Sequence, residues 1–185
     1  MKSAFWLLLE TLVSLLASVC LLRAFAWWQK LSARNPIMPF VFAVTDWIVK
    51  PLRRIVPASR RVDWASLAAA LLLAIALASV YSLLMRARSP LQLGVLFFAI
   101  FWLCKWAVYL LIGVVLLQAV LSWVNPQAPM APALEQLSRP FLAPIRRFIP
   151  LLGGVDLSPL LLILLAQVLL SLLEALLEAA LRFVS

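Results

Sequence analysis

Two arginine pairs in nearly the same surroundings are the first residues of this chain whose types and spacing could do chemistry. Arg53-Arg54 lie in P-L-R-R-I-V-P, and Arg146-Arg147 lie in P-I-R-R-F-I-P. Guanidinium groups bind phosphate and carboxylate oxygens, and apolar neighbours can anchor such a segment at a membrane surface. The pairs could bind an anionic lipid headgroup or an acidic partner, or they could set topology while paired with a nearby Asp. We favour the second interpretation.

An aspartate follows each arginine block at the same interval. Asp63 and Asp156 lie six residues after the last proline of their blocks and just before long apolar runs. A carboxylate at this position suits the dipole of a following helix and could also hold an arginine, so we favour helix capping over ligand binding. After Asp156 the sequence predicts a helix start, with Ser158 as N-cap and Pro159 at the first helical position.

Four charges inside the apolar runs form a second group of candidates. Glu10 and Lys105 lie several residues inside such runs, where ionisable side chains are rare and face a partner or a wet cavity. An offset of 95 residues superimposes the two, so we hypothesise a buried Glu10–Lys105 pair that fixes how the halves of the chain pack. In the alternative, Lys105 reaches toward the interface and Glu10 is protonated or reaches the outer surface. Glu174 and Glu178, one helical turn apart, could bind a cation, but we expect a solvated helix face.

Motifs for metal binding or nucleophilic catalysis are missing from the sequence. The chain has no His, and Cys20 and Cys104 both lie within apolar runs. This excludes the usual zinc and haem ligand sets and a His-assisted nucleophile. No P-loop, H-E-x-x-H or C-x-x-C is present. We therefore expect a protein that is not an enzyme and that uses no metal or cofactor.

Composition places the chain in a membrane. Of its 185 residues, 66% are hydrophobic and 12% are charged, whereas a soluble domain is nearer half and a quarter. The mean hydropathy is +1.09. The net charge of +9 comes from short basic clusters between apolar runs, which favours contact with anionic lipid headgroups over binding of nucleic acid.

Four apolar runs are long enough to span a membrane, which takes roughly 20 helical residues. They are Ala4–Leu22, Trp64–Met85, residues of about 97–117 within Leu91–Val124, and Pro159 to about Leu181. The third run is too long for one perpendicular crossing, so it either tilts or begins at the interface. The first run follows Lys2 like a signal peptide, but the repeat described next argues against cleavage.

The chain repeats itself at an offset of 93 residues. This offset superimposes the two arginine blocks without a gap, together with Pro36 on Pro129 and Val62-Asp63 on Val155-Asp156. Each copy contains two spans, so both copies enter the membrane in the same direction. We predict a first repeat at residues 1–88 and a second at residues 89–185. The fold class is an all-α membrane protein of four transmembrane helices in two parallel two-helix repeats.

A long connection joins the two spans of each copy, and we expect it to contain an interfacial helix. In the first copy this helix is Phe40–Val49, bounded by Pro39 and Pro51, and in the second it is Ala133–Arg139. Such short helices lie at the headgroup boundary or enter it shallowly. Eleven Lys and Arg lie in the connections and four on the opposite side, so the connections are predicted to be cytoplasmic.

These features together resemble the YggT (YlmG) family of small integral membrane proteins of bacteria and plastids. The resemblance rests on Arg23 after the first span, on Asn35-Pro36 and Asn125-Pro126, on the two arginine blocks, and on G-G-V-D-L-S-P at 153–159. The first copy departs from it with Arg60-Arg61 in place of Gly153-Gly154, where we expect a tight turn, and lacks the Ser-Pro. The resemblance implies links to osmotic tolerance and to the biogenesis of membrane complexes.

Two functions remain open at this point. The first is a scaffold or an assembly or stress-tolerance factor of the cell inner membrane, acting on other membrane proteins, on lipids or on further copies of itself. The second is a pathway for ions or small solutes, alone or as an oligomer, lined by Glu10, Lys105 and Gln167. We favour the scaffold, because four helices offer little room for a hydrated route.

Overall fold

Six helices make up the parts of the chain that the computed structural model describes, namely residues 4–33, 35–84, 91–148 and 156–184. They are α1 (Ala4–Trp28), α2 (Ile37–Ile55), α3 (Trp64–Leu84), α4 (Leu91–Val124), α5 (Ala131–Arg146) and α6 (Ser158–Val184). No strand occurs within these ranges. The predicted all-α class is confirmed.

Four of the helices are long and apolar enough to cross a membrane, as the sequence predicts. The qualifying segments are Ala4–Trp28, Trp64–Leu83, Gly94–Val124 and Ser158–Ala180. Met85, the expected end of the second span, lies outside the described residues. α4 is one continuous helix of 34 residues, about 50 Å at 1.5 Å per residue, so it must tilt in a core of about 30 Å or extend beyond it.

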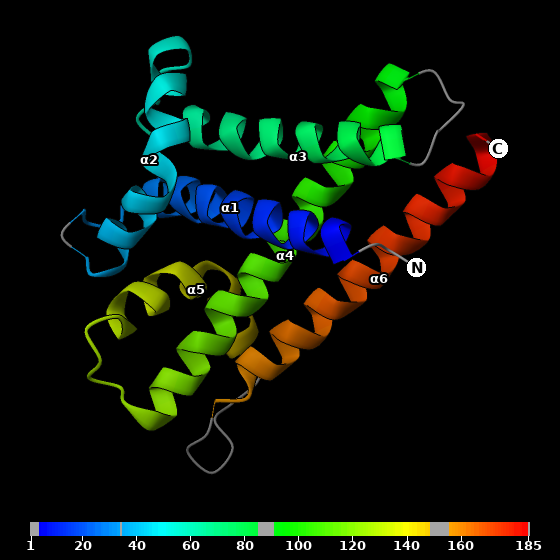
Figure 1. Cartoon of the computed structure of the whole chain (residues 1–185). Helices are drawn as coiled ribbons and strands as arrows, with labels where there is room; N and C mark the ends of the chain where they lie inside the picture. The colour runs from blue at the N-terminus through cyan, green and yellow to red at the C-terminus, as the bar shows by residue number, and fades with distance from the viewer. Residues whose placement is uncertain (1–3, 34, 85–90, 149–155, 185) are drawn as a thin grey trace.

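The helices follow the same order in the two copies, α1-α2-α3 and α4-α5-α6. Figure 1 shows α2 and α5 at one end of the molecule, with the starts of α1 and α4 and the ends of α3 and α6 toward the other. Within each copy the two long helices lie side by side, and α4 crosses the α1–α3 pair. The predicted boundary between the copies, after residue 88, lies outside the described residues.

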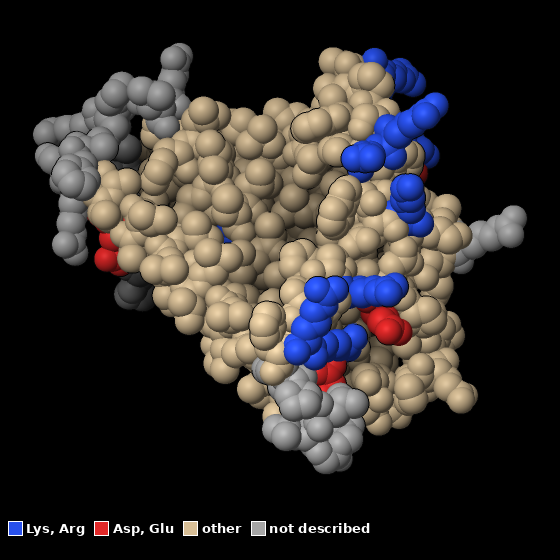
Figure 2. Space-filling model, turned by 180° about the vertical axis from the view of Figure 1, so that it is seen from behind, with Lys and Arg blue, Asp and Glu red and all other residues tan. Residues whose placement is uncertain are grey.

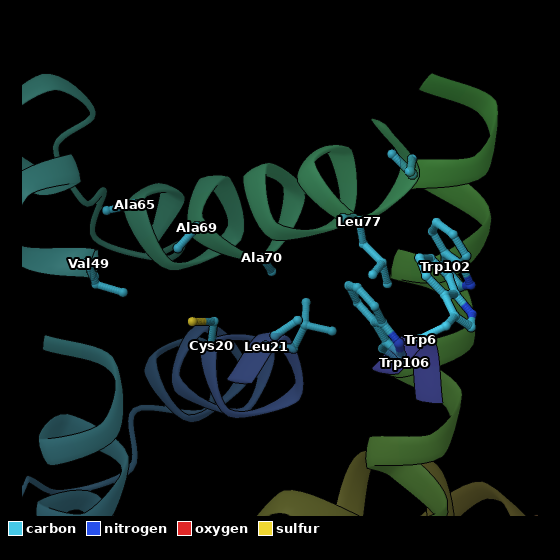
Figure 3. Packing of buried hydrophobic residues seen from close by; sticks show 14 residues of the cluster. Trp6, Cys20, Leu21, Val49, Ala65, Ala69, Ala70, Leu77, Trp102 and Trp106 are labelled. Atoms are coloured by element: carbon cyan, nitrogen blue, oxygen red, sulfur yellow. The ribbon is translucent and has the colours of Figure 1, made fainter. Parts of the chain in front are cut away.

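Small side chains allow the spans of the first copy to pack closely. Five alanines form a fully buried stripe on α3, at positions 65, 69, 70, 74 and 78. Small residues let helix backbones approach each other in a membrane, where the hydrophobic effect does not drive helices together. Where α1 meets α4, the larger side chains of Trp6, Trp102 and Trp106 fill the space (Figure 3).

Both connection helices are longer than the sequence predicts, and they continue through their prolines. α2 includes Pro51 and the first arginine pair, and α5 includes Pro140 and Pro144. The expectation that Pro51 ends the first helix is wrong. An interior proline removes one hydrogen bond and costs roughly 3 kcal/mol, but α2 offsets this cost with a buried stripe against the bundle. Its members are Met38, Val41, Thr45 and Val49.

Candidate functional site

Arg23 is the centre of a buried cluster of charges at the end of the molecule where α2 lies. Its side chain, on α1, is only 4% exposed. Nη1 donates hydrogen bonds to Thr45 Oγ1 at 2.7 Å and to Asp46 Oδ1 at 2.8 Å, both on α2. The guanidinium also lies over the ring of Phe42, with Cζ 4.8 Å from the centroid. A buried charge needs such partners because removal from water is costly, so Arg23 holds α1 to α2.

Asp63 extends this cluster to α3. Its carboxylate is fully buried and accepts hydrogen bonds from Arg53 Nη2 and from Ser66 Oγ, each at 2.7 Å. Arg23 Nε lies 3.8 Å from the same Oδ2. The Ser66 N–H points to Oδ1 at 3.4 Å, as expected of a residue that caps α3. We call Arg23, Thr45, Asp46, Arg53 and Asp63 the α1–α2–α3 ion network.

Asp46 lies at the outer edge of this network and also binds Lys50 Nζ, at 2.8 Å. Burial raises the pKa of its carboxyl, but hydrogen bonds from Lys50 and Arg23 and their positive charges outweigh that effect. The resulting pKa lies below the ordinary value of 3.8. Asp46 is therefore ionised at neutral pH and serves as an acceptor for both cations.

The second copy has a simpler version of this arrangement. Arg146 Nε donates to Asp156 Oδ2 at 2.8 Å, and Asp156 Oδ1 accepts the Ser158 N–H at 2.9 Å. Burial raises the Asp156 pKa, but hydrogen bonds from Ser158 and Arg146 lower it below its ordinary value. α6 begins at Ser158, so the carboxylate supplies the capping acceptor where the sequence predicted Ser158 as N-cap. Gly153-Gly154 lie outside the described residues.

Two substitutions explain why the network does not recur in the second copy. The offset of 95 residues that relates Glu10 to Lys105 places Gln118 where the first copy has Arg23, and the offset of 93 places Arg139 where it has Asp46. Arg139 is exposed. The second copy therefore has neither the buried guanidinium nor its carboxylate partner, and only the pairing of arginine with Asp156 remains.

The two members of each predicted arginine pair face different surroundings. Arg53 and Arg146 each bind the aspartate of their own copy. Arg53 is partly buried, whereas Arg54, Arg146 and Arg147 are exposed. Other exposed cations at the same end are Lys30, Lys50, Arg60, Arg61 and Arg139. Figure 2 shows Lys and Arg in two groups at this end, separated by surface formed by other residues. The structure thus brings together the predicted arginines and aspartates and pairs one arginine of each block with the aspartate of its own copy.

Lys105 has a different partner from the one hypothesised. Its Nζ lies 2.7 Å from Oε1 of Glu174, on α6. α4 and α6 lie side by side within the second copy, whereas the approach of α1 to α4 is occupied by Trp6, Trp102 and Trp106 (Figure 3). Glu174, expected on a solvated face, is instead half of an ion pair, although its side chain is 54% exposed.

An apolar cavity of about 310 Å³ lies between the two copies. It is lined by Leu21, Ala24, Phe25, Trp28, Val62, Leu67, Ala107, Leu110, Leu111, Val114 and Phe141. Phe25 and Phe141 meet there with ring centroids 5.8 Å apart. Sequence patterns do not reveal such a cavity, because its lining comes from α1, α3, α4, α5 and the residue before Asp63.

Sequence reasoning also missed the two α2 residues that bind Arg23. The signal was present, because Thr45-Asp46 is a polar dipeptide within the apolar segment F-V-F-A-V-T-D-W-I-V. Arg23 directly follows an apolar run long enough to span the membrane, a position that is typical of a topology-setting charge. Among the described residues, no group of three or more His, Cys, Asp or Glu lies together as a metal site.

The fold and the site define the class of this chain: a multi-pass α-helical membrane protein of two similar helical units, with a basic surface at one end. The family model described as CCB3/YggT matches residues 2–84 and 97–177, one segment in each copy. The chain belongs to the CCB3/YggT family, as the resemblance predicted.

Its curated relatives include three bacterial proteins of similar length. "Uncharacterized protein YggT" of Escherichia coli (strain K12) is 38% identical over 87% of this chain and 84% of its own. "Uncharacterized protein in proC 3'region" of Vibrio alginolyticus is 35% identical over 84% of this chain and 85% of its own. A Haemophilus influenzae protein is 33% identical over 83% of this chain and 82% of its own. No solved structure matches the chain.

Proposed function

We propose that this protein is a non-enzymatic scaffold of the bacterial inner membrane that binds other membrane proteins or anionic lipids at its basic end. By the positive-inside rule this end faces the cytoplasm, because the long connections carry most of the Lys and Arg. A scaffold of this kind would serve in assembling membrane complexes. It needs a rigid frame and an accessible binding surface, but no reaction centre.

The observation that carries the proposal is that the two arginines of each pair differ in what they contact. Arg53 binds the buried Asp63, and Arg146, which is itself at the surface, binds the partly buried Asp156, so both arginines contribute to the fold. Their neighbours Arg54 and Arg147 face outward. Guanidinium groups bind phosphate and carboxylate with two parallel hydrogen bonds, which suits lipid headgroups and acidic protein segments.

The outer face of α2 supports an interfacial position for this surface. Phe40, Ala43 and Trp47 are exposed on one stripe, and Lys50 and Arg54 continue it toward the end of the helix. Aromatic rings prefer the headgroup level, and basic side chains extend from it toward phosphates and water. This stripe would place the basic end at the surface of the membrane, where peripheral segments of other membrane proteins are accessible.

The test is site-specific photocrosslinking in native membranes. A photoreactive phenylalanine analogue at Trp47, on the proposed binding surface, should give discrete protein adducts, including any adduct with a second copy. The same analogue at Leu172, exposed on α6 away from the basic end, is the matched control and should give lipid adducts only. Identical adducts from the two positions would refute a docking role. Ion flux in proteoliposomes that Lys105→Gln abolishes would favour the pathway instead.

A further inference from the structure

The cavity between the copies reaches the basic end of the molecule. On α1 its lining runs from Leu21 to Trp28, the last residue of the helix, which is about 10 Å along the axis at 1.5 Å per residue. Val62, two residues before α3 begins, also lines it. Trp28 and Ala107 are exposed, so the cavity opens at the surface of the protein. It therefore runs along the spans and reaches the end where the exposed cations lie.

The side chains that line the cavity favour a hydrocarbon ligand. All eleven residues that line the cavity are apolar or aromatic, and its volume of about 310 Å³ is within the range of small-molecule sites. Water is held in a cavity only where polar groups bind it, which this lining does not provide. In a bilayer, the available occupant of such a shape is a segment of acyl chain lying along the spans.

Two arginines are positioned next to this cavity by a short hydrogen-bonded turn. Arg60 and Arg61 precede the lining residue Val62, and both are exposed. Ser59 closes the turn: its N–H donates to Val62 O at 2.9 Å, and its Oγ accepts the Val62 N–H at 3.0 Å. Trp27 Nε1 donates to Ser59 O at 3.1 Å, which ties the turn to α1.

The aspartates of the α1–α2–α3 ion network, which lie near this turn, bind other side chains. Asp63 is fully buried and bound to Arg53 and Ser66, and Asp46 lies on α2 between Arg23 and Lys50. Arg60 and Arg61 therefore present a positive charge that the network does not neutralise. An anionic group would complete it, and in a membrane the phosphate of a lipid lies at the end of its acyl chains.

We propose that this cavity holds one acyl chain of an anionic phospholipid and that Arg60 and Arg61 bind its phosphate. This inference rests on the proposed function in one respect, namely that the basic end lies at an anionic membrane surface. It also gives a role to the divergence between the copies, because the positions of Arg60-Arg61 are Gly153-Gly154 in the second copy. The second copy would then lack an equivalent lipid site.

The experiment is native mass spectrometry of the full chain in detergent with equimolar phosphatidylglycerol and phosphatidylcholine of the same acyl composition. The wild type should retain one phosphatidylglycerol in preference to phosphatidylcholine. Ala107→Trp, which fills the cavity from an exposed position, and the double variant Arg60→Gln/Arg61→Gln should each lower this retention by about tenfold. Leu111→Phe serves as a second filling variant in case Ala107→Trp does not fold, as judged from elution volume and unfolding temperature.

Matched controls separate this site from general attraction to a basic surface. Ala175→Trp places the same bulk on an exposed position of α6, and Lys30→Gln/Arg139→Gln removes the same charge elsewhere at the basic end. Both controls should retain the lipid. Equal loss in the two charge variants would overturn the site while leaving the basic surface of the proposed function intact. Retention of phosphatidylcholine that Ala107→Trp blocks and the charge variants do not change would identify an uncharged occupant and also overturn it.

Discussion

Replacing Arg23 with Gln should destabilise the protein more than any other single charge removal at the basic end. Glutamine is the residue that the second copy has at this position, Gln118, so the helix backbone tolerates it. The variant loses the charged hydrogen bonds from Nη1 to Thr45 and Asp46, formed by a side chain that is 4% exposed. Removing one partner of a buried ion pair costs about 3–5 kcal/mol.

The lower end of that range applies here, because both carboxylates keep another cation. Asp63 retains Arg53, and Asp46 retains Lys50. We therefore expect Arg23→Gln to lower the free energy of unfolding by about 3 kcal/mol. Asp46→Asn should cost less, about 1 kcal/mol, because this side chain is 28% exposed and its bond to Lys50 lies near the surface.

The assay measures unfolding in mixed micelles of mild detergent and sodium dodecyl sulfate, with tryptophan fluorescence as the signal. The same titration is then run in the refolding direction. Arg54→Gln, an exposed neighbour in the same arginine pair as Arg53, is the control and should stay within about 0.5 kcal/mol of wild type. If Arg23→Gln were no less stable than Arg54→Gln, the ion network would not hold the helices together, and the reasoning from burial would fail.

Three further predictions use the same unfolding assay. Exchanging the charges of Lys105 and Glu174 should recover most of the stability lost in either single variant; a double variant no better than the worse single one would rule out the pairing. The pKa of Asp46 is depressed by folding, so the stability advantage of wild type over Asp46→Asn should be complete above about pH 5 and disappear as pH falls through a folded pKa below 3.8. An advantage that grew on acidification would contradict this. Ala69→Leu should cost about 1–3 kcal/mol by overfilling the fully buried stripe of α3, whereas Leu72→Ala, on the exposed side, should cost less.

Apolar patterning was sufficient to predict the spans and the order of the helices. Long apolar runs with few charges can bury their backbone groups in a bilayer only as helices, so the number of spans follows from the length and hydrophobicity of the runs. The pairing of Arg53 with Asp63 and of Arg146 with Asp156 was also predictable, because both pairs lie ten residues apart around one short connection.

Contacts between distant segments were not predictable in this way. The repeat offset superimposes Glu10 on Lys105 but does not show which neighbouring helix Lys105 faces, and the structure pairs it with Glu174. The ends of α2 differ from the prediction because proline commonly bounds a helix, whereas burial of one face of α2 against the bundle stabilises the helix through Pro51. Arg23 was missed because its burial depends on α2, which the sequence does not place.

We propose that Arg54 and Arg147 bind partners, while Arg53 and Arg146 bind the aspartates that hold the fold. Photocrosslinking from Trp47 in native membranes, with Arg54 and Arg147 both replaced by Gln, tests it most directly. We expect protein adducts to fall by about tenfold while the unfolding free energy stays within about 0.5 kcal/mol of wild type. Adducts that persist unchanged in this double variant would contradict it.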